Sequence, residues 1–337
     1  MISTLELKQF RGLEHIEFEN LGRANLIIGG NNTGKTSILE SLVLLYGNEN
    51  QLRNLPQTFR KQPHEAMDQG IGFWRSLVMN ESTLELSIKA NGGYATGSSL
   101  QGLVENGTAQ FVDPVKSRDV FELEPHATVS FDSDGHLEIH RARVRTKLSI
   151  VPTKQADPGD ISELFNQIAP LNPENEIKLE KLLRKSIEPR LRRLRYARPQ
   201  GTNPHLVYVD LGNSPMLPFT QLGQAFARTL EIYCEIFANR PKILLIDEIE
   251  NGLYYEGMED FWKGLMAVLE DQDVQLFATT HSRECMEAAH KAAASMEGDP
   301  LRFLRLDRRV DDPGKIVATT FGKDEMQTAI EFNREMR

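Results

Sequence analysis

A glycine-rich segment near the N-terminus has the residue types that bind phosphate. Residues 29–36, GGNNTGKT, fit the pattern G-x-x-x-x-G-K-[ST]. Glycines let backbone N–H groups curl around an anion because no Cβ intrudes, and a helix that starts at the end of the loop points its positive dipole end at the same anion. In such loops the lysine reaches the β- and γ-phosphates and the hydroxyl after it ligates Mg²⁺, which are the roles expected for Lys35 and Thr36. We therefore predict an ATP and Mg²⁺ site with contacts from Gly29, Asn31, Asn32, Thr33, Gly34, Lys35, Thr36 and Ser37.

A second chemical pattern is an apolar run that ends in two carboxylates. Residues 243–248 read ILLIDE. A continuous apolar run of this kind indicates a strand buried on both faces, and a charge at the carboxyl end of such a strand usually belongs to a site. Asp247 is expected to hold Mg²⁺ through water, and Glu248 to orient and deprotonate the attacking water. An acidic helix start would show the same residues. The phosphate loop on the same chain favours the catalytic interpretation.

A third apolar run, residues 274–278, leads into Thr279-Thr280-His281-Ser282. His281 follows the strand directly, so its side chain is placed to reach a γ-phosphate. The alternative is a surface turn in which Ser282 caps the next helix. Because the strand-then-polar order repeats that of the other two motifs, we predict that His281 senses or stabilises the phosphate.

Hydrophobic periodicity gives the elements that must position these residues. Short strands and amphipathic helices alternate at both ends of the chain, which predicts an α/β fold with a mixed, largely parallel central sheet. Residues 82–152 look β-rich, and residues 174–198 look helical and basic. We therefore expect a nucleotide-binding head formed by residues 1–50 and 200–337, with an inserted lobe over residues 51–199. A hairpin is expected over 301–320, with Asp311 and Asp312 as turn residues; the acidic cluster at Asp132 and Asp134 is also expected in a turn.

Composition limits the classes of protein that this chain can belong to. It has 337 residues, a formal net charge of −9 and two cysteines, Cys234 and Cys285, without metal or disulfide spacing. We expect both thiols to be buried in a reducing cytoplasm, and Phe73 and Trp74 to be core residues. No apolar run reaches the roughly 18–20 residues that span a bilayer, and the first residues lack the shape of a targeting signal, so no membrane association is expected.

Four strings of residues, in the same order, resemble those of a known family: Phe10-Arg11-Gly12, GGNNTGKTS at 29–37, ILLIDEIENGLYY at 243–255 and LFATTHSREC at 276–285. They are similar to the ABC-type P-loop ATPase heads of the SMC, RecF and OLD (overcoming-lysogenization-defect) group, most of all to stand-alone, OLD-related bacterial ATPases. The resemblance covers the expected head well and residues 50–200 poorly. It implies an ATPase that holds ATP between two copies of its head.

The resemblance implies further site residues. Arg11 is expected near the phosphates, and Glu250–Leu253 is expected to cross the dimer interface, although the family commonly has histidine where this chain has Tyr254. A signature loop that closes over the ATP of the other subunit is expected at residues 220–225, with Gly223 facing the phosphate. This segment lacks the Ser-Gly-Gly run of transporters, and an ordinary helix start would also explain it. The glutamine that usually links nucleotide to the inserted lobe cannot be assigned.

A basic stretch stands out in an otherwise acidic chain. Residues 178–198 contain nine Lys or Arg against two Glu, and the arginines are densest from Arg190 to Arg198. A stripe of this kind suits a phosphate backbone. It also suits an acidic protein partner, or a solvated helix that binds nothing, and the sequence leaves the three interpretations open.

These observations favour an ATPase that forms a homodimer, or a higher even-numbered homo-oligomer, on binding ATP. We expect its cycle to control a DNA-linked or defence effector, in a setting such as phage defence or DNA repair. The effector is expected to be separate, for example a nuclease, because the roughly 55 residues after His281 are too few for a fused nuclease domain. The alternatives are the ATP-binding subunit of a transporter and a nucleotide-gated module with little hydrolysis. The presence of Glu248, the expected base, argues against the second alternative.

Overall fold

A six-stranded sheet forms the centre of the molecule, which a computed structural model describes for residues 1–59, 85–92, 98–105, 108–112, 125–131, 137–141, 146–198, 205–212 and 215–326. Its strands, in spatial order, are β16 (Ile316–Phe321), β15 (Leu301–Arg308), β3 (Ala24–Gly29), β14 (Gln275–Thr279), β13 (Ile243–Ile246) and β9 (Leu148–Val151). All neighbours are parallel except β15 and β16. The mixed, largely parallel sheet predicted from the sequence is confirmed.

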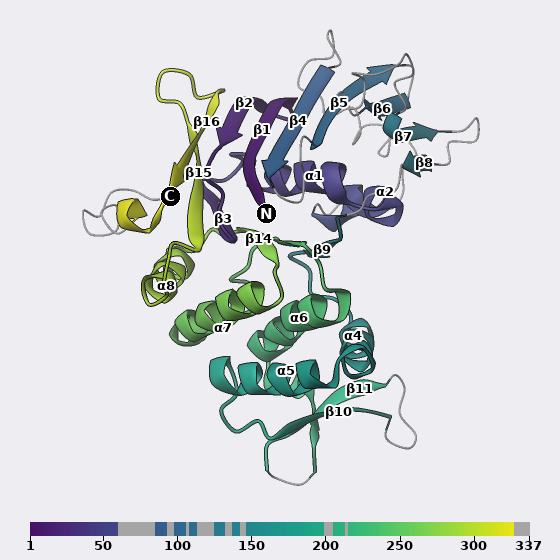
Figure 1. Cartoon of the computed structure of the whole chain (residues 1–337), viewed down its shortest axis with the longest axis vertical. Helices are drawn as coiled ribbons and strands as arrows, with labels where there is room; N and C mark the ends of the chain where they lie inside the picture. Colours follow the sequence, from purple (N-terminus) through teal and green to yellow (C-terminus); the bar gives the residue numbers. More distant parts are fainter. Residues whose placement is uncertain are drawn as a thin grey trace.

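The central strands are apolar throughout because both of their faces are covered. Along β13, Ile243 and Leu245 belong to one hydrophobic core, and Leu244 and Ile246 belong to the other. Helices cover the second of these faces: α4 (Pro158–Leu171), α5 (Pro173–Ser186), α6 (Gln224–Asn239), α7 (Met258–Asp271) and α8 (Arg283–Ala294), which form the lower half of Figure 1. Trp262 of α7 is fully buried in this core.

The other face of the central sheet is covered by α1 (Lys35–Tyr46), α2 (Glu49–Thr58) and a second sheet. This seven-stranded antiparallel sheet has the order β2 (Leu13–Phe18), β1 (Ile2–Phe10), β4 (Glu85–Gly92), β5 (Ser98–Glu105), β6 (Thr108–Val112), β7 (Pro125–Phe131) and β8 (Leu137–Arg141). Helix α1 is buried on nearly every side. Its position fixes the phosphate loop between two packed layers.

A third, small sheet lies beyond α4 and α5 (Figure 1) and consists of β10 (Arg193–Ala197), β11 (Leu206–Asp210) and β12 (Leu217–Pro218). The prediction of one basic helix over 174–198 is therefore wrong in its second half. Helix α5 ends at Ser186, and Pro189 cannot continue a helix. In β10 the buried Leu194 lies between the exposed Arg193 and Arg195, which is the period of a strand.

Other expectations can be compared with the described residues. The hairpin of β15 and β16 is present, with Asp311 and Asp312 in its turn, and both cysteines are buried. Phe73, Trp74, Asp132 and Asp134 lie outside the described residues. No helix in the described ranges is long and apolar enough to cross a membrane.

The division of the chain into a head and an inserted lobe stays a prediction. The described strands from residues 51–199 all belong to sheets that the head also builds, because β4 pairs with β1, β9 pairs with β13 and β10 pairs with β11. The limits at 51 and 199 therefore do not separate two sheets.

Candidate functional site

The phosphate loop connects β3 directly to α1, as its sequence predicts. Gly34 has a φ of 92° and forms the N-cap of α1, where no side chain caps the first turn. A Cβ on Gly34 would lie 2.9 Å from Leu13 Cδ2, and a Cβ on Gly29 would overlap the carbonyl oxygen of Leu306. The backbone of β15 requires glycine at position 29, and the left-handed φ favours glycine at position 34. The uncapped N–H groups of α1 are left for an anion.

Lys35 is held against the loop that it serves. Its Nζ donates to the carbonyl oxygens of Gly29, at 2.8 Å, and Gly30, at 2.7 Å, and only 5% of the residue is exposed. Burial lowers the pKa of Lys35, and the carboxylates of Asp247 and Glu250 act in the opposite direction. The ammonium thus lies in a partly desolvated place where an anion gains most from it.

Asp247 follows β13 and is clasped by two threonines. Thr153 Oγ1 donates to Asp247 Oδ2, and Thr279 Oγ1 donates to Asp247 Oδ1, each at 2.7 Å. Thr279 Oγ1 also accepts the backbone N–H of Glu248 at 2.8 Å. The strands β9, β13 and β14 end side by side, so their first polar residues meet at one edge of the sheet. Sequence reasoning missed both threonines because they are separated from Asp247 by 94 and 32 residues.

Glu248 and His281 face one another at the same edge. His281 Nε2 lies 3.9 Å from Glu248 Oε1, and the two side chains are 42% and 41% exposed. Glu248 has a φ of 50°, a left-handed conformation that is uncommon for this residue type and often marks a functional site. The two side chains therefore have room to receive a water molecule and a phosphate from the solvent side.

Glu250 organises the segment around these residues. Its Oε1 accepts the backbone N–H of His281 at 2.7 Å, whereas Oε2 is buried with no hydrogen-bond partner among the described residues. The backbone of the same segment is tied to β14, since Ile249 N–H donates to the carbonyl oxygen of Thr279. Sequence reasoning placed Glu250 only in a loop at the expected interface and assigned it no contact with His281.

Gly223 lies at the exposed start of α6. It is the N-cap, with a φ of 92° and no side-chain capping bond, and a Cβ there would meet nothing within 4 Å. Thr220 belongs to the short 3₁₀ helix Phe219–Leu222 and does not cap α6. The segment Glu250–Leu253 packs on this helix start, because a Cβ on Gly252 would lie 3.2 Å from Gln224 Cβ.

Two further residues concern the expected nucleotide contacts. Arg11 makes a two-pronged ion pair with Glu40 of α1, at 2.9 and 3.2 Å, so it braces the helix behind the phosphate loop, and its role at the phosphates stays a prediction. Gln155 lies four residues past the end of β9, on the loop that carries Thr153. Sequence reasoning assigned the expected link to the inserted lobe to no glutamine.

The residues present fit a nucleotide with a divalent metal ion. Each oxygen of Asp247 accepts one threonine hydroxyl and keeps a second lone pair, so it can still bind a water of a metal shell. The phosphate loop supplies uncapped N–H groups and a buried ammonium. Thr36, half-buried in the first turn of α1, supplies a hydroxyl.

Comparison with known proteins agrees with this geometry. Residues 24–287 match the family model described as "AAA domain, putative AbiEii toxin, Type IV TA system". An ATP/GTP phosphatase of Helicobacter pylori is 22% identical, over 85% of this chain and 87% of that protein. An uncharacterised protein of Methanocaldococcus jannaschii is 52% identical over 44 residues, which are 13% of this chain and 20% of that protein.

Solved structures with the same fold include heads of SMC proteins. An SMC head bound to the C-terminal winged-helix domain of ScpA has a TM-score of 0.55 at 11% identity, covering 97% of this chain and 99% of that chain. The Pyrococcus furiosus Smc head with an extended coiled coil, bound to the C-terminal domain of ScpA, has a TM-score of 0.50 at 12% identity, covering 99% of both. These likenesses concern the fold, and they do not favour the transporter alternative.

Proposed function

The chain belongs to the family of AAA domains described as "putative AbiEii toxin, Type IV TA system", and it is an ATPase with a head of the SMC, RecF and OLD kind; from this premise we propose that two copies close over ATP and that this cycle controls a separate effector. The observation that carries the proposal is the open side of the site. Glu248 and His281 are each about two-fifths exposed, whereas Gly34 and Gly29 of the phosphate loop pack closely against β2 and β15.

A second copy of the chain offers the group that would close this side. Gly223 places an uncapped helix start at the surface, and the N-terminus of a helix of 16 residues attracts an anion. The same helix start contacts Gly252 in the loop that is expected at the interface. A two-fold pair would therefore give each site one Gly223 from the partner.

The roles of this chain's own residues follow from their places. The N–H groups of the phosphate loop and Lys35 bind the phosphates, and Thr36 and Asp247 would hold Mg²⁺, which shields the phosphate charge when it is bound. Glu248 takes the proton of the attacking water, and His281 stabilises the charge that develops on the γ-phosphate. Gln155 lies on the loop that would report this state to the rest of the chain.

A mixing experiment tests closure by two copies. Lys35→Ala removes the phosphate ligand and Gly223→Arg blocks the surface that acts on the partner, so each variant alone is expected to be inactive. Random pairing of equal amounts makes half of the dimers mixed, each with one intact site of two, so turnover should return to about a quarter of the wild-type value. A monomer in ATP and Mg²⁺ by light scattering, or no recovery on mixing, contradicts the proposal. Glu248→Gln, which should bind ATP and dimerise without turnover, is the positive control for assembly.

The effector is the second part of the proposal. Glu248→Gln should hold the closed dimer, whereas Lys35→Ala should hold the open state, and the two variants differ from wild type at single positions of the same site. An effector controlled by the cycle should therefore copurify with one of them and not with the other. Equal recovery of every protein by both variants counts against ATP-controlled binding.

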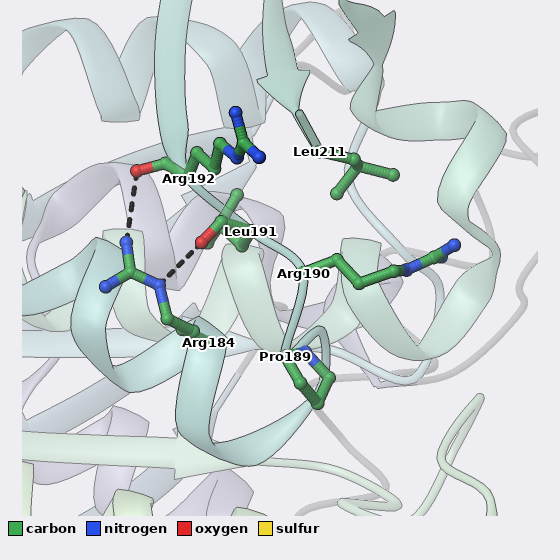
Figure 2. Close-up of a pocket in the computed structure, with 6 residues that line it drawn as sticks. All are labelled: Arg184, Pro189, Arg190, Leu191, Arg192 and Leu211. Atoms are coloured by element: carbon green, nitrogen blue, oxygen red, sulfur yellow. Dashed lines mark hydrogen bonds between the residues drawn. The ribbon is translucent and has the colours of Figure 1, made fainter. Parts of the chain in front are cut away.

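We also propose that nucleic acid binds to a basic surface made by Arg190, Arg192, Arg193 and Arg195. Figure 2 shows the pocket beside it, where Arg184 donates to the carbonyl oxygens of Leu191 and Arg192 and so fixes the segment before β10. Arg190 is paired with Glu188, with its Nε 2.9 Å from Glu188 Oε1, whereas none of the ion pairs among the described residues involves Arg192, Arg193 or Arg195. Exposed arginines without a carboxylate partner, such as these three, favour an external polyanion.

Salt dependence distinguishes this surface from a protein-docking site. Duplex DNA, single-stranded DNA and RNA should each be titrated by fluorescence anisotropy over a range of salt concentrations. Arg193→Gln with Arg195→Gln should lower the slope of log K against log salt by about 2 for a duplex. Lys242→Gln with Lys263→Gln, two lysines paired with carboxylates elsewhere, is the matched control and should leave the slope unchanged. An unchanged slope in the arginine variant excludes this surface and favours an acidic protein partner.

A further inference from the structure

A buried ion pair inside α6 lies directly behind the candidate site. Arg228 and Glu231 are 3% and 2% exposed, and Arg228 Nη1 donates to Glu231 Oε2 at 3.1 Å. Burying two charges costs more than their attraction returns unless other hydrogen bonds complete them. The groups to which Arg228 and Glu231 are hydrogen-bonded therefore indicate the role of this ion pair.

Arg228 reaches two backbone segments of the site. Nη2 donates to the carbonyl oxygen of Asp247 at 3.2 Å, and Nη1 donates to the carbonyl oxygen of Pro152 at 2.8 Å. The first carbonyl belongs to the peptide that joins Asp247 to Glu248. The second belongs to the peptide before Thr153, which donates to Asp247 Oδ2. One guanidinium thus holds the backbone on both sides of the Asp247 carboxylate.

Glu231 binds the same loop, whereas Arg228 Nε stays without a partner among the described residues. Its Oε1 accepts the backbone N–H of Ala156 at 3.2 Å, next to Gln155. Burial raises the pKa of Glu231, while Arg228 and the Ala156 N–H lower it, so the carboxylate depends on both partners to stay ionised. The pair therefore ties the whole 152–156 loop to α6.

Helix α6 starts at Gly223, in the turn before Arg228. Arg228 is five residues further along, about 7.5 Å along the helix axis. A rigid helix of this length moves as one body, so a displacement at Gly223 is carried to the peptide of Glu248 and to the Gln155 loop.

We infer that Arg228 and Glu231 are positioning residues that set the orientation of Glu248 according to the position of α6. The inference rests on the proposed function for the reason that α6 would move, which is contact of Gly223 with ATP on the partner. The contacts of Arg228 with Asp247 and Pro152 do not depend on the proposed function, because each chain makes them by itself. Neither residue forms a hydrogen bond with the phosphate loop, residues 29–36.

The test is the separation of turnover from binding. Arg228→Gln alone strands a buried carboxylate and risks unfolding, so the main variant is Arg228→Met with Glu231→Leu, which replaces the whole pair by apolar side chains. We expect kcat to fall by about 10²-fold, as for a misplacement of about 1 Å, while the Kd for a fluorescent ATP analogue stays within threefold. Arg228→Lys keeps the positive charge but loses the two-pronged guanidinium. Its kcat should therefore lie between those of wild type and the double variant. Arg302→Gln is the matched control, because Arg302 also donates to backbone carbonyls, three of them where Arg228 has two, and it lies at the start of β15, away from the phosphate loop.

Light scattering of the same variants in ATP keeps the two claims apart. If the double variant dimerises like wild type but kcat falls, both stand. If neither wild type nor the double variant dimerises and the kcat of the double variant still falls, dimer closure is wrong and the positioning role stands. The positioning role is overturned if the folded double variant keeps kcat within twofold of wild type, or if ATP affinity falls in parallel with kcat.

Discussion

Three threonines are equally buried but differ in what their hydroxyl groups bind, and replacing each by valine separates site geometry from general packing. Thr279 Oγ1 donates to Asp247 and accepts the N–H of Glu248. Thr280 Oγ1 accepts the N–H of Ser282 at 3.0 Å. Thr229 Oγ1 on α6 is buried without a partner among the described residues. All three are at most 1% exposed, so their surroundings are comparable.

Thr279→Val should be the most damaging of the three. It removes one hydrogen bond to a carboxylate and one to a backbone N–H, which together are worth about 2–4 kcal/mol. An unfolding entropy of about 2.1 cal/mol/K per residue converts this to a fall in Tm of roughly 3–6 °C over 337 residues. Because Asp247 and Glu248 both lose a fixed partner, turnover should also fall by about 10- to 100-fold.

The other two substitutions are controls with opposite expectations. Thr280→Val removes the bonds to the Ser282 N–H and to the buried thiol of Cys285, both neutral groups, so a loss of about 1–2 kcal/mol is expected, with turnover within threefold of wild type. Thr229→Val removes a hydroxyl that is already unpaired, so its stability should be unchanged or higher by up to about 1 kcal/mol.

Thermal unfolding followed by circular dichroism, and phosphate release with saturating ATP and Mg²⁺, measure the two quantities on the same samples. The Tm should be lowest for Thr279→Val, intermediate for Thr280→Val and highest for Thr229→Val. Turnover that stays at the wild-type level in Thr279→Val would refute the reasoning, because the clasp on Asp247 would then have no consequence for the site. A loss of turnover that is equal in all three would point to packing instead.

Three further predictions concern the loop, the thiols and pH. Gly34→Ala should cost about 1–2 kcal/mol, because a φ of 92° is unfavourable with a Cβ that also crowds Leu13, and ATP affinity by titration should fall with it. Burial raises the pKa of Cys285 to about 12 and that of Cys234 well above its usual value, so neither thiol should react with a thiol reagent at pH 8 until urea is added. Burial also raises the pKa of Glu235 on α6. Its stabilising contribution is present below about pH 4.3 and is lost as the pH rises through the raised pKa, so Glu235→Gln should gain stability over wild type between pH 4 and pH 7 in denaturant titrations.

Local patterns sufficed for the parts of the site that each lie on one short segment. The phosphate loop, the strand before Asp247 and the strand before His281 were predicted because each consists of a buried strand followed at once by polar residues, and hydrophobic period and glycine placement report this locally. The parallel sheet followed from the same alternation of strands and helices. The end of α5 was also readable from Pro189 and from the two-residue period of β10, but the density of arginine obscured it.

Pairing between distant segments was decided only by the tertiary structure. Strand β9 pairs with β13, with Leu148 opposite Ile243. No local sequence pattern predicts which strands will be neighbours. The threonine clasp on Asp247 and the contacts of Arg228 with the loop after β9 are consequences of that neighbourhood. The sequence by itself thus determined the chemical groups and the elements that carry them, because these depend on adjacent residues; the partners of those groups depend on packing across the sheet, which only the folded chain specifies.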